Sequence, residues 1–348
     1  MSETGVDPLK RVAVTGASGF VGTALVHRLA EAGVTVVGTD RYAPETPLPV
    51  ESFVVADIGD EDALAGVVAG TDVVFHLGAV ASIARAPRGL YQRVNVQGTD
   101  GLLACARAAG ARRVVHVSSS TVYGVPDENP IREDRALAPA CPYSRSKAEA
   151  EAMCARHAAE GIEVAIIRPR VVVGPGRAGI FALLFTFLRK GLPIPLPGGA
   201  SNQFQLTAVD DLAEACILAA EPGVNVDGAR VFNIGSEVNR PLRGDLEELI
   251  AHAQSPSRLI PVPAWPATTS LSLLHTLGIG PMVPEQLKVL TADFVLDTRR
   301  AREELGFQPS GPNVRGLLAA WDWWRDNAPP GGVMRWWRAR HQNALQDR

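Results

Sequence analysis

Apolar runs and helical stretches alternate along the first half of the chain. The apolar runs are rich in β-branched residues, as buried strands are, and they lie at 11–15, 34–40, 52–56, 73–77, 113–118 and 164–168. Stretches with leucine, valine and alanine at helical spacing separate them, among them 63–69, 94–109 and 146–161. This alternation predicts an α/β fold, with a doubly wound parallel sheet covered by helices on both faces.

The pattern changes after residue 168. Proline and glycine cluster at 174–176 and 193–199, and 255–284 is apolar but broken by prolines. Such loops commonly shape a substrate pocket. Because 231–235 reads as one more strand of the sheet, we expect the second part to be discontinuous in sequence. The main domain is predicted at 9–170 with 205–236, a small lobe at 171–204 and 237–328, and a C-terminal tail at 329–348.

A glycine-rich turn follows the first apolar run. The segment TGASGFVG places Gly16, Gly19 and Gly22 between that strand and a helix that stops at Gly33. Gly16 permits the turn, Gly19 lets the backbone approach a pyrophosphate, and Gly22 allows close helix packing. Strand, turn and helix together predict a Rossmann-like dinucleotide site.

An acid ends the second strand, about 20 residues after the glycines, as the dinucleotide pattern requires. Asp40 would accept hydrogen bonds from an adenosine ribose and repel a 2′-phosphate, which favours NAD over NADP. Arg41 leaves NADP open, because a guanidinium can pair with that phosphate. The alternative is that Asp40 is only a solvated acid at a strand end.

Tyr143 and Lys147 are four residues apart at the start of the helical stretch 146–161. That spacing puts both side chains on one helix face. A free tyrosine has a pKa of about 10, and a nearby ammonium and an oxidised nicotinamide would favour its phenolate. We therefore predict that Tyr143 is a general acid/base for an alcohol or ketone. The alternative, a surface helix start with a solvated lysine, is disfavoured by the glycine turn.

Four hydroxyl residues, 118–121, directly follow the strand at 113–117. Open α/β sheets bind ligands at the carboxyl ends of their strands, so one of these hydroxyls is placed to hold a substrate oxygen. We favour Ser119. Some of the four are expected only to bond the local backbone, as in any polar turn.

Composition narrows the class of protein. The chain has 348 residues, with 34 basic and 37 acidic residues and a net charge of −3, which gives no nucleic-acid footprint. No apolar run has membrane-spanning length and no signal peptide is recognisable, so we expect a cytoplasmic protein. Cys105, Cys141, Cys154 and Cys216 lack the short paired spacing of zinc or redox sites and are expected to be reduced, mostly buried thiols. We expect no metal.

The tail carries Trp336 and Trp337 between arginines. Two interpretations stay open, a short interfacial membrane anchor and a segment that packs on its own domain or on a dimer partner. We favour the second. His76, at the end of the fourth strand, is expected to be structural rather than chemical.

These motifs, in this order, resemble those of the extended short-chain dehydrogenase/reductases, the group with UDP-galactose 4-epimerase, dTDP-glucose 4,6-dehydratase and 3β-hydroxysteroid dehydrogenase. The resemblance covers about 10–324. The matching segments are TGASGFVG, Asp40, Asp57-Ile58, HLGA at 76–79, NVQGT at 95–99, SSSTVYG at 118–124, YSRSK at 143–147, IRPRVVVGPG at 167–176, 209–211, and Asp297 with Ala301, Leu305, Gly306 and Pro309.

The resemblance implies an NAD-dependent enzyme with catalytic Ser119, Tyr143 and Lys147, and it favours a homodimer. It places Asp57 and Ile58 at the adenine, Gly78 and Ala79 at the pyrophosphate and ribose, Lys147 also at the nicotinamide ribose, and 169–171 beside the nicotinamide carboxamide and the substrate. The residues expected to bind the cofactor are Gly16, Ser18, Gly19, Phe20, Val21, Gly22, Asp40, Arg41, Asp57, Ile58, Leu77, Gly78, Ala79, Asn95, Val117, Tyr143, Lys147, Pro169 and Val171.

The substrate side departs from the family pattern. Sugar-nucleotide members usually have asparagine at the position of Val171 and a diphosphate-binding arginine near Phe204. The dehydratases have an Asp-Glu pair at 120–121, where hydroxyls replace it poorly at neutral pH, so dehydration is disfavoured. Donors for an anionic substrate remain. The residues expected to line the substrate site are Ser120, Thr121, Arg170, Arg177, Asn202 and Gln205.

Two enzyme functions stay close in this interpretation. The first is epimerisation of a nucleotide sugar. The second is a net dehydrogenase or ketoreductase of the 3β-hydroxysteroid type, favoured by the apolar residues at 171 and 204. A minor third is a non-catalytic module that senses the dinucleotide, which is disfavoured because both Tyr143 and Lys147 are retained.

Overall fold

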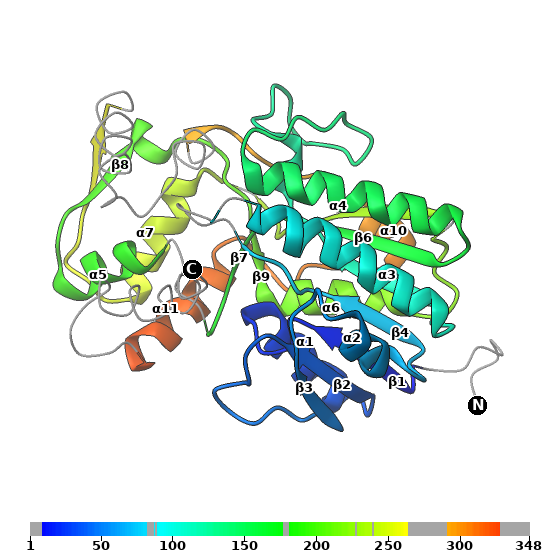
Figure 1. Cartoon of the computed structure of the whole chain (residues 1–348). Helices are drawn as coiled ribbons and strands as arrows, with labels where there is room; N and C mark the ends of the chain where they lie inside the picture. Colours follow the sequence, from blue (N-terminus) through cyan, green and yellow to red (C-terminus); the bar gives the residue numbers. More distant parts are fainter. Residues whose placement is uncertain are drawn as a thin grey trace.

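Seven parallel strands form one sheet, which lies in the right-hand part of the molecule in Figure 1. The computed structural model describes residues 9–81, 87, 89–176, 181–226, 228–238, 240–263 and 291–327. From one edge of the sheet to the other, the strands are β10 (Ala229–Ile234), β6 (Glu163–Pro169), β5 (Arg113–Val117), β4 (Val73–His76), β1 (Arg11–Thr15), β2 (Thr35–Asp40) and β3 (Ser52–Val55).

The strand order reverses between β1 and β4, which are neighbours although β2 and β3 separate them in sequence. In open α/β sheets, ligands bind outside the carboxyl ends of the strands at such a reversal. The predicted doubly wound parallel sheet is confirmed, and β1, which leads into the glycine turn, is one of the two strands at the reversal.

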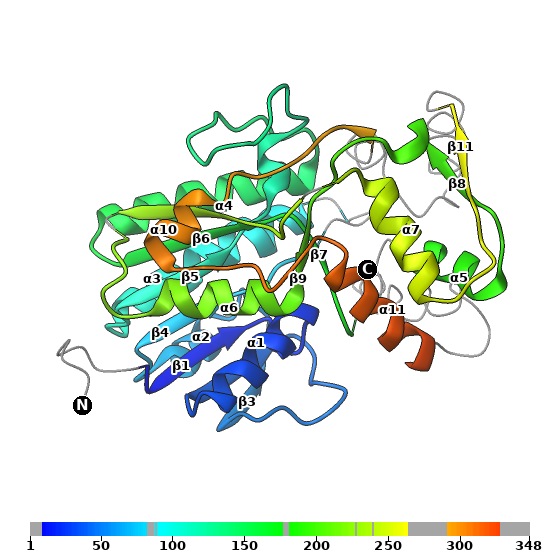
Figure 2. The same ribbon diagram turned by 180° about the vertical axis from the view of Figure 1, so that it is seen from behind.

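Helices cover both faces of the sheet (Figure 2). On one face lie α1 (Phe20–Glu31), α6 (Val209–Ala220) and the short α10 (Arg299–Leu305). On the other face lie α2 (Glu61–Val68), α3 (Gly98–Ala108) and α4 (Pro142–Ala159). A π-helix, Gln92–Gln97, leads directly into α3.

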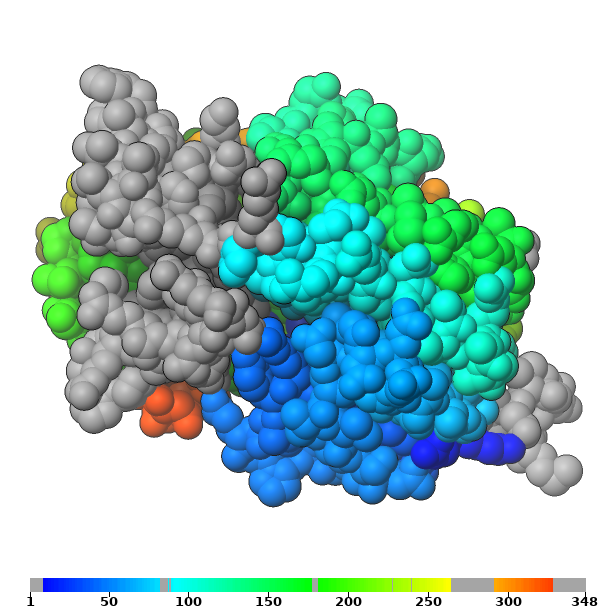
Figure 3. All heavy atoms as spheres, in the orientation of Figure 1, coloured from blue at the N-terminus to red at the C-terminus, as the bar shows by residue number. Residues whose placement is uncertain are grey.

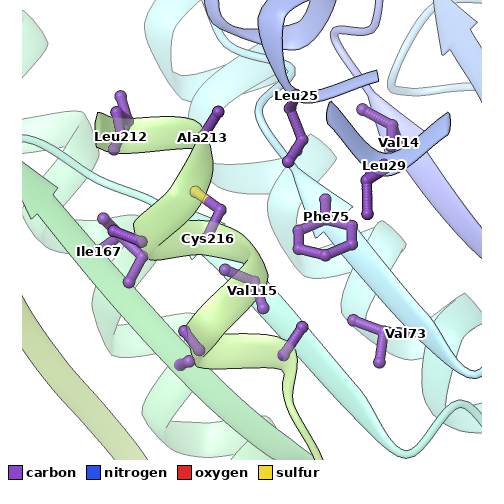
Figure 4. Close-up of a cluster of buried hydrophobic side chains, with 14 of the residues drawn as sticks. Val14, Leu25, Leu29, Val73, Phe75, Val115, Ile167, Leu212, Ala213 and Cys216 are labelled. Atoms are coloured by element: carbon purple, nitrogen blue, oxygen red, sulfur yellow. The ribbon is translucent and has the colours of Figure 1, made fainter. Parts of the chain in front are cut away.

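The core on the first face forms where α1 and α6 meet the sheet (Figure 4). Leu25 and Leu29 of α1 face Cys216 of α6 across Phe75 of β4 and Val115 of β5. All five side chains are fully buried. Alternate strand residues pack on opposite faces because a strand has a period of two, so Val12 and Val14 belong to this core and Ala13 to the other.

The small lobe lies beside the carboxyl ends of the strands. Two short parallel pairs belong to it, β7 (Val171–Val173) with β9 (Leu206–Ala208), and β8 (Ile194–Pro197) with β11 (Leu259–Val262). Its helices are α5 (Ala182–Lys190), α7 (Leu242–His252) and α11 (Arg315–Asn327). They pack around a separate apolar cluster that includes Phe185, Leu249, Trp321 and Trp324.

Two features differ from what the sequence indicated. Helix α4 begins at Pro142 rather than near 146, because Cys141 and Ser144 cap it reciprocally, so Tyr143 lies inside the first turn. Helix α10 falls in the range assigned to the lobe, yet its Ala301 and Leu305 belong to the core of the sheet.

The space-filling view in Figure 3 shows one side of the sheet-bearing domain. On this side the N-terminal segments (blue to cyan) and α4 (green) form the surface.

Candidate active site

The glycine turn after β1 leaves no space for side chains. Gly16 has a φ of +69°, and a Cβ built on it would lie 2.8 Å from the amide nitrogen of Gly78. A Cβ on Gly22 would lie 2.0 Å from the carbonyl oxygen of Gly16. Glycine is therefore required at both positions, for the turn and for close packing of α1 against it. The close approach of Gly16 to Gly78 also joins the turn to the HLGA segment after β4.

Helix α1 begins at this turn without a side-chain cap. Gly19 is its N-cap residue, and the first turn contains no acidic residue. The amide groups at a helix start carry a partial positive charge and bind phosphate when no side chain covers them. The turn therefore fits a dinucleotide pyrophosphate, as Gly16, Gly19 and Gly22 predicted.

Asp40 lies at the end of β2, beside the glycine turn. Its carboxylate accepts hydrogen bonds from Ser18 Oγ (2.7 Å) and from the backbone amide of Arg41 (2.7 Å). The Arg41 guanidinium in turn faces Asp57, with Nε 3.8 Å from the carboxylate oxygen. A 2′-phosphate would have to compete with Asp57 for Arg41 and would meet the charge of Asp40. This arrangement suits NAD better than NADP.

Asn95, in the π-helix, connects the loop after β4 to α4. Its Oδ1 accepts from the amide of Val80 (2.8 Å), and its Nδ2 donates to the carbonyl of Val80 (3.1 Å) and to Ser146 Oγ (2.9 Å). Ser146 donates to the carbonyl of Tyr143 (2.7 Å). Asn95 therefore reaches the turn of Tyr143 through protein contacts. Ile58 packs nearby, with Cγ2 2.6 Å from the position that a Cβ on Gly98 would take.

His76 is buried and hydrogen-bonded to Thr15 Oγ1 (2.8 Å) and Thr99 Oγ1 (2.9 Å). Burial and, to a lesser extent, the charge of Lys147 lower its pKa to about 3. The imidazole is therefore neutral at physiological pH, and both of its nitrogens have protein partners. These contacts fit the structural role that the sequence indicated.

Lys147 extends from α4 to the end of β5. Its side chain is 2% exposed, and Nζ donates to the carbonyl of Val117 (2.7 Å). Burial lowers its pKa to about 8. Tyr143, one turn earlier on the same helix, is half-buried and meets the ring of Tyr91 edge to face, with the ring centroids 6.1 Å apart. Lys147 therefore lies at the carboxyl end of β5, with Tyr143 one turn earlier on the same helix.

The hydroxyl run 118–121 divides into separate roles. Ser118 Oγ donates to Glu151 (2.5 Å) inside the protein. Ser119 Oγ accepts from the amide (3.3 Å) and the hydroxyl (3.0 Å) of Thr121 and caps the short 3₁₀-helix Ser120–Tyr123. The expectation that some of these hydroxyls bond the local backbone is met by Ser119, whereas Ser118 bonds a carboxylate distant in sequence. Ser119 still has its own proton to donate.

A buried polar network that was not predicted from the sequence lies beneath this site. Glu151 pairs with Arg168 through both carboxylate oxygens, at 2.9 and 2.5 Å. Arg168 also donates to Tyr123 Oη (2.7 Å), which donates to Asn233 (2.8 Å). Burial by itself lowers the pKa of Arg168, but the hydrogen bonds to Glu151 and the charge of that carboxylate outweigh burial and raise the pKa of Arg168 above its usual range. The signal was present: Glu151 is four residues after Lys147 on α4, and Arg168 interrupts an apolar strand.

The predicted substrate residues do not share one environment. Gln205 is buried, and its amide contacts the backbone of Ser236 (2.9 Å) and Leu296 (2.8 Å). Asn202 donates to the carbonyl of Ala292 (2.9 Å). Arg170 lies against Phe204, deep beside the end of β6. Arg177 and the tail 329–348 lie outside the described residues.

Within the described part of the chain, no group of three or more His, Cys, Asp or Glu side chains is arranged to hold a metal, and the four cysteines are free. Two of the thiols, Cys154 and Cys216, are buried, and two are half-buried. In the same residues, no helix is both long and apolar enough to cross a membrane.

A dinucleotide turn at the reversal of a doubly wound sheet, with a Tyr-Lys pair at the next strand end, defines an extended short-chain dehydrogenase/reductase. The model of the NAD dependent epimerase/dehydratase family matches residues 12–235. The chain therefore belongs to this family and is an NAD-dependent enzyme.

Relatives within the family have different reactions. A UDP-glucose 4-epimerase from Mycolicibacterium smegmatis is 32% identical over 337 residues, covering 91% of this chain and 99% of the relative. A 2-alkyl-3-oxoalkanoate reductase from Stenotrophomonas maltophilia is 33% identical over 260 residues, covering 71% and 76%. The solved structure of MoeE5 in complex with UDP-glucose and NAD matches with a TM-score of 0.71 and 27% identity, over 92% of this chain and 100% of that one.

Proposed function

We propose that this enzyme transfers a hydride at a secondary alcohol or ketone carbon, and that its reaction is the epimerisation of a nucleotide sugar. The observation that carries the proposal is Lys147, a buried cation on the same helix face as Tyr143 at the carboxyl end of β5. Such a cation favours the phenolate form of a neighbouring tyrosine. The similarity to UDP-glucose 4-epimerases supports the choice of reaction.

Three residues share the chemistry. Tyr143 Oη accepts the proton of the substrate hydroxyl and returns it in the reverse step. Lys147 stabilises the phenolate and bonds a ribose of the cofactor. Ser119 Oγ donates to the substrate oxygen and holds it in place. Ser120 and Thr121 border the same position.

The glycine turn and the ends of β2 and β4 hold the cofactor in this proposal. Bound NAD supplies the hydride acceptor. The amides of the α1 start face its pyrophosphate, Asp40 accepts from the adenosine ribose, and Asp57 with Ile58 borders the adenine. Pro169 and Val171 border the nicotinamide. Asn95 takes part as a positioning residue, because its amide holds the loop of Val80.

The alternative is a net ketoreductase or dehydrogenase on a substrate without a nucleotide. Apolar residues at 171 and 204, and the similarity to a 2-alkyl-3-oxoalkanoate reductase, favour it.

The two functions differ in how they use the cofactor, because an epimerase regenerates its NAD in each turnover, whereas a net reductase must exchange it. Gel filtration of the purified protein separates them: we expect NAD to stay bound in near-stoichiometric amount. Loss of NAD, with turnover of a 3-oxo acid and NADH, would support the reductase.

Tyr143→Phe tests the chemistry directly. We expect kcat to fall by about 10²- to 10⁴-fold, because the acid/base is removed, while the Kd for NAD stays within about twofold. Turnover is measured on the substrate found by screening nucleotide sugars, hydroxysteroids and 3-oxo acids. Unchanged turnover would reject Tyr143 as the acid/base, and a protein whose every activity survived would fit the non-catalytic module.

We also propose that the enzyme acts as a cytoplasmic homodimer. Sedimentation equilibrium of the full chain tests the assembly, and a mass near 36.9 kDa would contradict the dimer.

A further inference from the structure

Arg170 directly follows the carboxyl end of β6 and immediately precedes β7. Its backbone amide is fixed by the carbonyl of Ile234 (3.1 Å) and by Thr207 Oγ1 (3.1 Å). The side chain is only 3% exposed. The position of this guanidinium is therefore set by the sheet and by β9, and it lies between the main domain and the lobe.

Two aromatic rings flank the guanidinium. Its central carbon is 4.6 Å from the ring centroid of Phe204 and 4.0 Å from that of Phe294. Aromatic faces attract a cation, but they do not accept hydrogen bonds from N–H groups in the guanidinium plane. The rings thus hold the charge and leave the donors of its edge unused.

Those donors have no partner in the described part of the chain. Nε and Nη2 of Arg170 are both buried there without a hydrogen bond. The other two arginines in the buried set are fully engaged. Arg113 pairs with Glu163 and donates to three backbone carbonyls, and Arg168 pairs with Glu151. Arg170 is the exception among them.

Burial of an unpaired charge is costly, so such a group is retained where something else uses it. Burial lowers the pKa of Arg170 to about 9, which still leaves it charged at neutral pH. A planar fork of free N–H donors matches the two oxygens of a carboxylate or phosphate. A neutral, apolar substrate would not pair with the guanidinium, so the free-energy cost of burying its charge would remain.

We propose that Arg170 is the receptor for an oxyanion group of the substrate, a phosphate or a carboxylate. The inference rests on the proposed function, since the anion belongs to the molecule oxidised beside Tyr143. It deepens that function by defining the substrate class as anionic, which excludes a neutral hydroxysteroid. Sugar-nucleotide members of the family usually have a diphosphate-binding arginine near the position of Phe204. In this chain, Arg170 would supply the cation for the substrate instead.

Pairs of ligands that differ in charge test the proposal. Dissociation constants are measured on the NAD-loaded full chain for UDP against uridine, and for 3-hydroxyoctanoate against its methyl ester. We expect the wild type to prefer the anion at least about tenfold in one pair, as charge-assisted hydrogen bonds to a buried guanidinium provide. The pair that shows the preference identifies phosphate or carboxylate.

In Arg170→Met the preference should fall to about twofold or less. Arg189→Met is the matched control: Arg189 also lies over an aromatic ring, that of Trp324 at 4.6 Å, but it is exposed on α5. It should keep the preference. Arg170→Met should also raise Tm in the absence of ligand, whereas removing a merely structural arginine would lower it.

The proposal is overturned if the wild type shows no preference in either pair, or if the preference survives in Arg170→Met. Should that variant not fold, Arg170→Gln replaces it under the same criteria. None of these measurements uses turnover. A failure of Tyr143 as acid/base therefore leaves the result on Arg170 intact, and the reverse also holds.

Discussion

Lys147 is a single residue whose protonation links folding to chemistry. Its pKa is about 8 in the folded protein, against an ordinary value of 10.5. Between these values the unfolded chain keeps a proton that the folded chain has released, so a rise in pH stabilises the folded state. Burial of the cation is thus a stability cost present below about pH 8, the range in which the proposed reaction uses the cation beside Tyr143.

The comparison of wild type with Lys147→Met isolates this effect. We expect the wild type to gain free energy of unfolding relative to the variant, on the order of 3 kcal/mol, as pH rises from 7.5 to 10.5. Urea denaturation at several pH values measures it, and the tyrosines and cysteines common to both proteins cancel. A difference that does not change with pH would mean that Lys147 is not perturbed by burial.

At the scale of the element, α4 is joined to β6 by the buried pair of Glu151 and Arg168, which are 6% and 5% exposed. Removing one charge of such a pair leaves the other uncompensated. We expect Glu151→Gln to lower the free energy of unfolding by about 3 kcal/mol or more. The control is Glu247→Gln, from an exposed pair with Arg243 four residues apart on α7, which should cost about 0.5 kcal/mol or less. Urea denaturation measures both variants, and equally small losses of unfolding free energy in Glu151→Gln and Glu247→Gln would contradict this prediction.

The turn between β1 and α1 depends on the contact of Gly22 with the carbonyl of Gly16. Gly22→Ala must push the helix away, so we expect NAD affinity to fall at least tenfold and Tm to drop by several degrees. Gly66→Ala is the control, because a Cβ there, inside α2, meets nothing within 4 Å. It should stabilise the protein by about 0.5–1 kcal/mol. Isothermal titration calorimetry measures the NAD affinity of both variants, and thermal melts measure their Tm. Normal NAD binding in Gly22→Ala would contradict this prediction.

The elements differ in how far the sequence predicts them. Buried parallel strands read as continuous β-branched runs, so β1 was predicted with both ends correct and the other strands of the first half to within two residues. The start of α4 was not predicted correctly, because its N-cap residue is a cysteine, which is not a usual capping residue. The partners of Arg168 and the lack of partners at Arg170 depend on segments distant in sequence. Local pattern cannot reveal such contacts.

At the scale of the whole molecule, the question is whether the sheet and the lobe fold as one unit. Several contacts join them at β7 and β9. Thr207 of β9 donates from Oγ1 to the carbonyl of Ile234 in β10 (3.1 Å), and the amide of Ser236, just after β10, donates to the carbonyl of Leu206 (2.8 Å). A Cβ on Gly174, just after β7, would lie 2.5 Å from Val209 Cγ1 at the start of α6, a helix that packs on the sheet. Close packing and buried hydrogen bonds at one junction favour cooperative unfolding.

The tryptophans make this testable, because all six lie beyond residue 260 and the sheet strands contain none. Tryptophan emission therefore reports on the C-terminal part of the chain, and far-UV circular dichroism on the whole. We expect the two urea transitions to coincide. Saturating NAD, at 100 times its Kd, should shift the unfolding free energy from both probes by about 2.7 kcal/mol, although the proposed NAD site is in the sheet-bearing domain. A fluorescence transition that stayed in place while the dichroism moved would show that the lobe unfolds on its own. The single junction at β7 and β9 would then be too weak to transmit binding between the two parts.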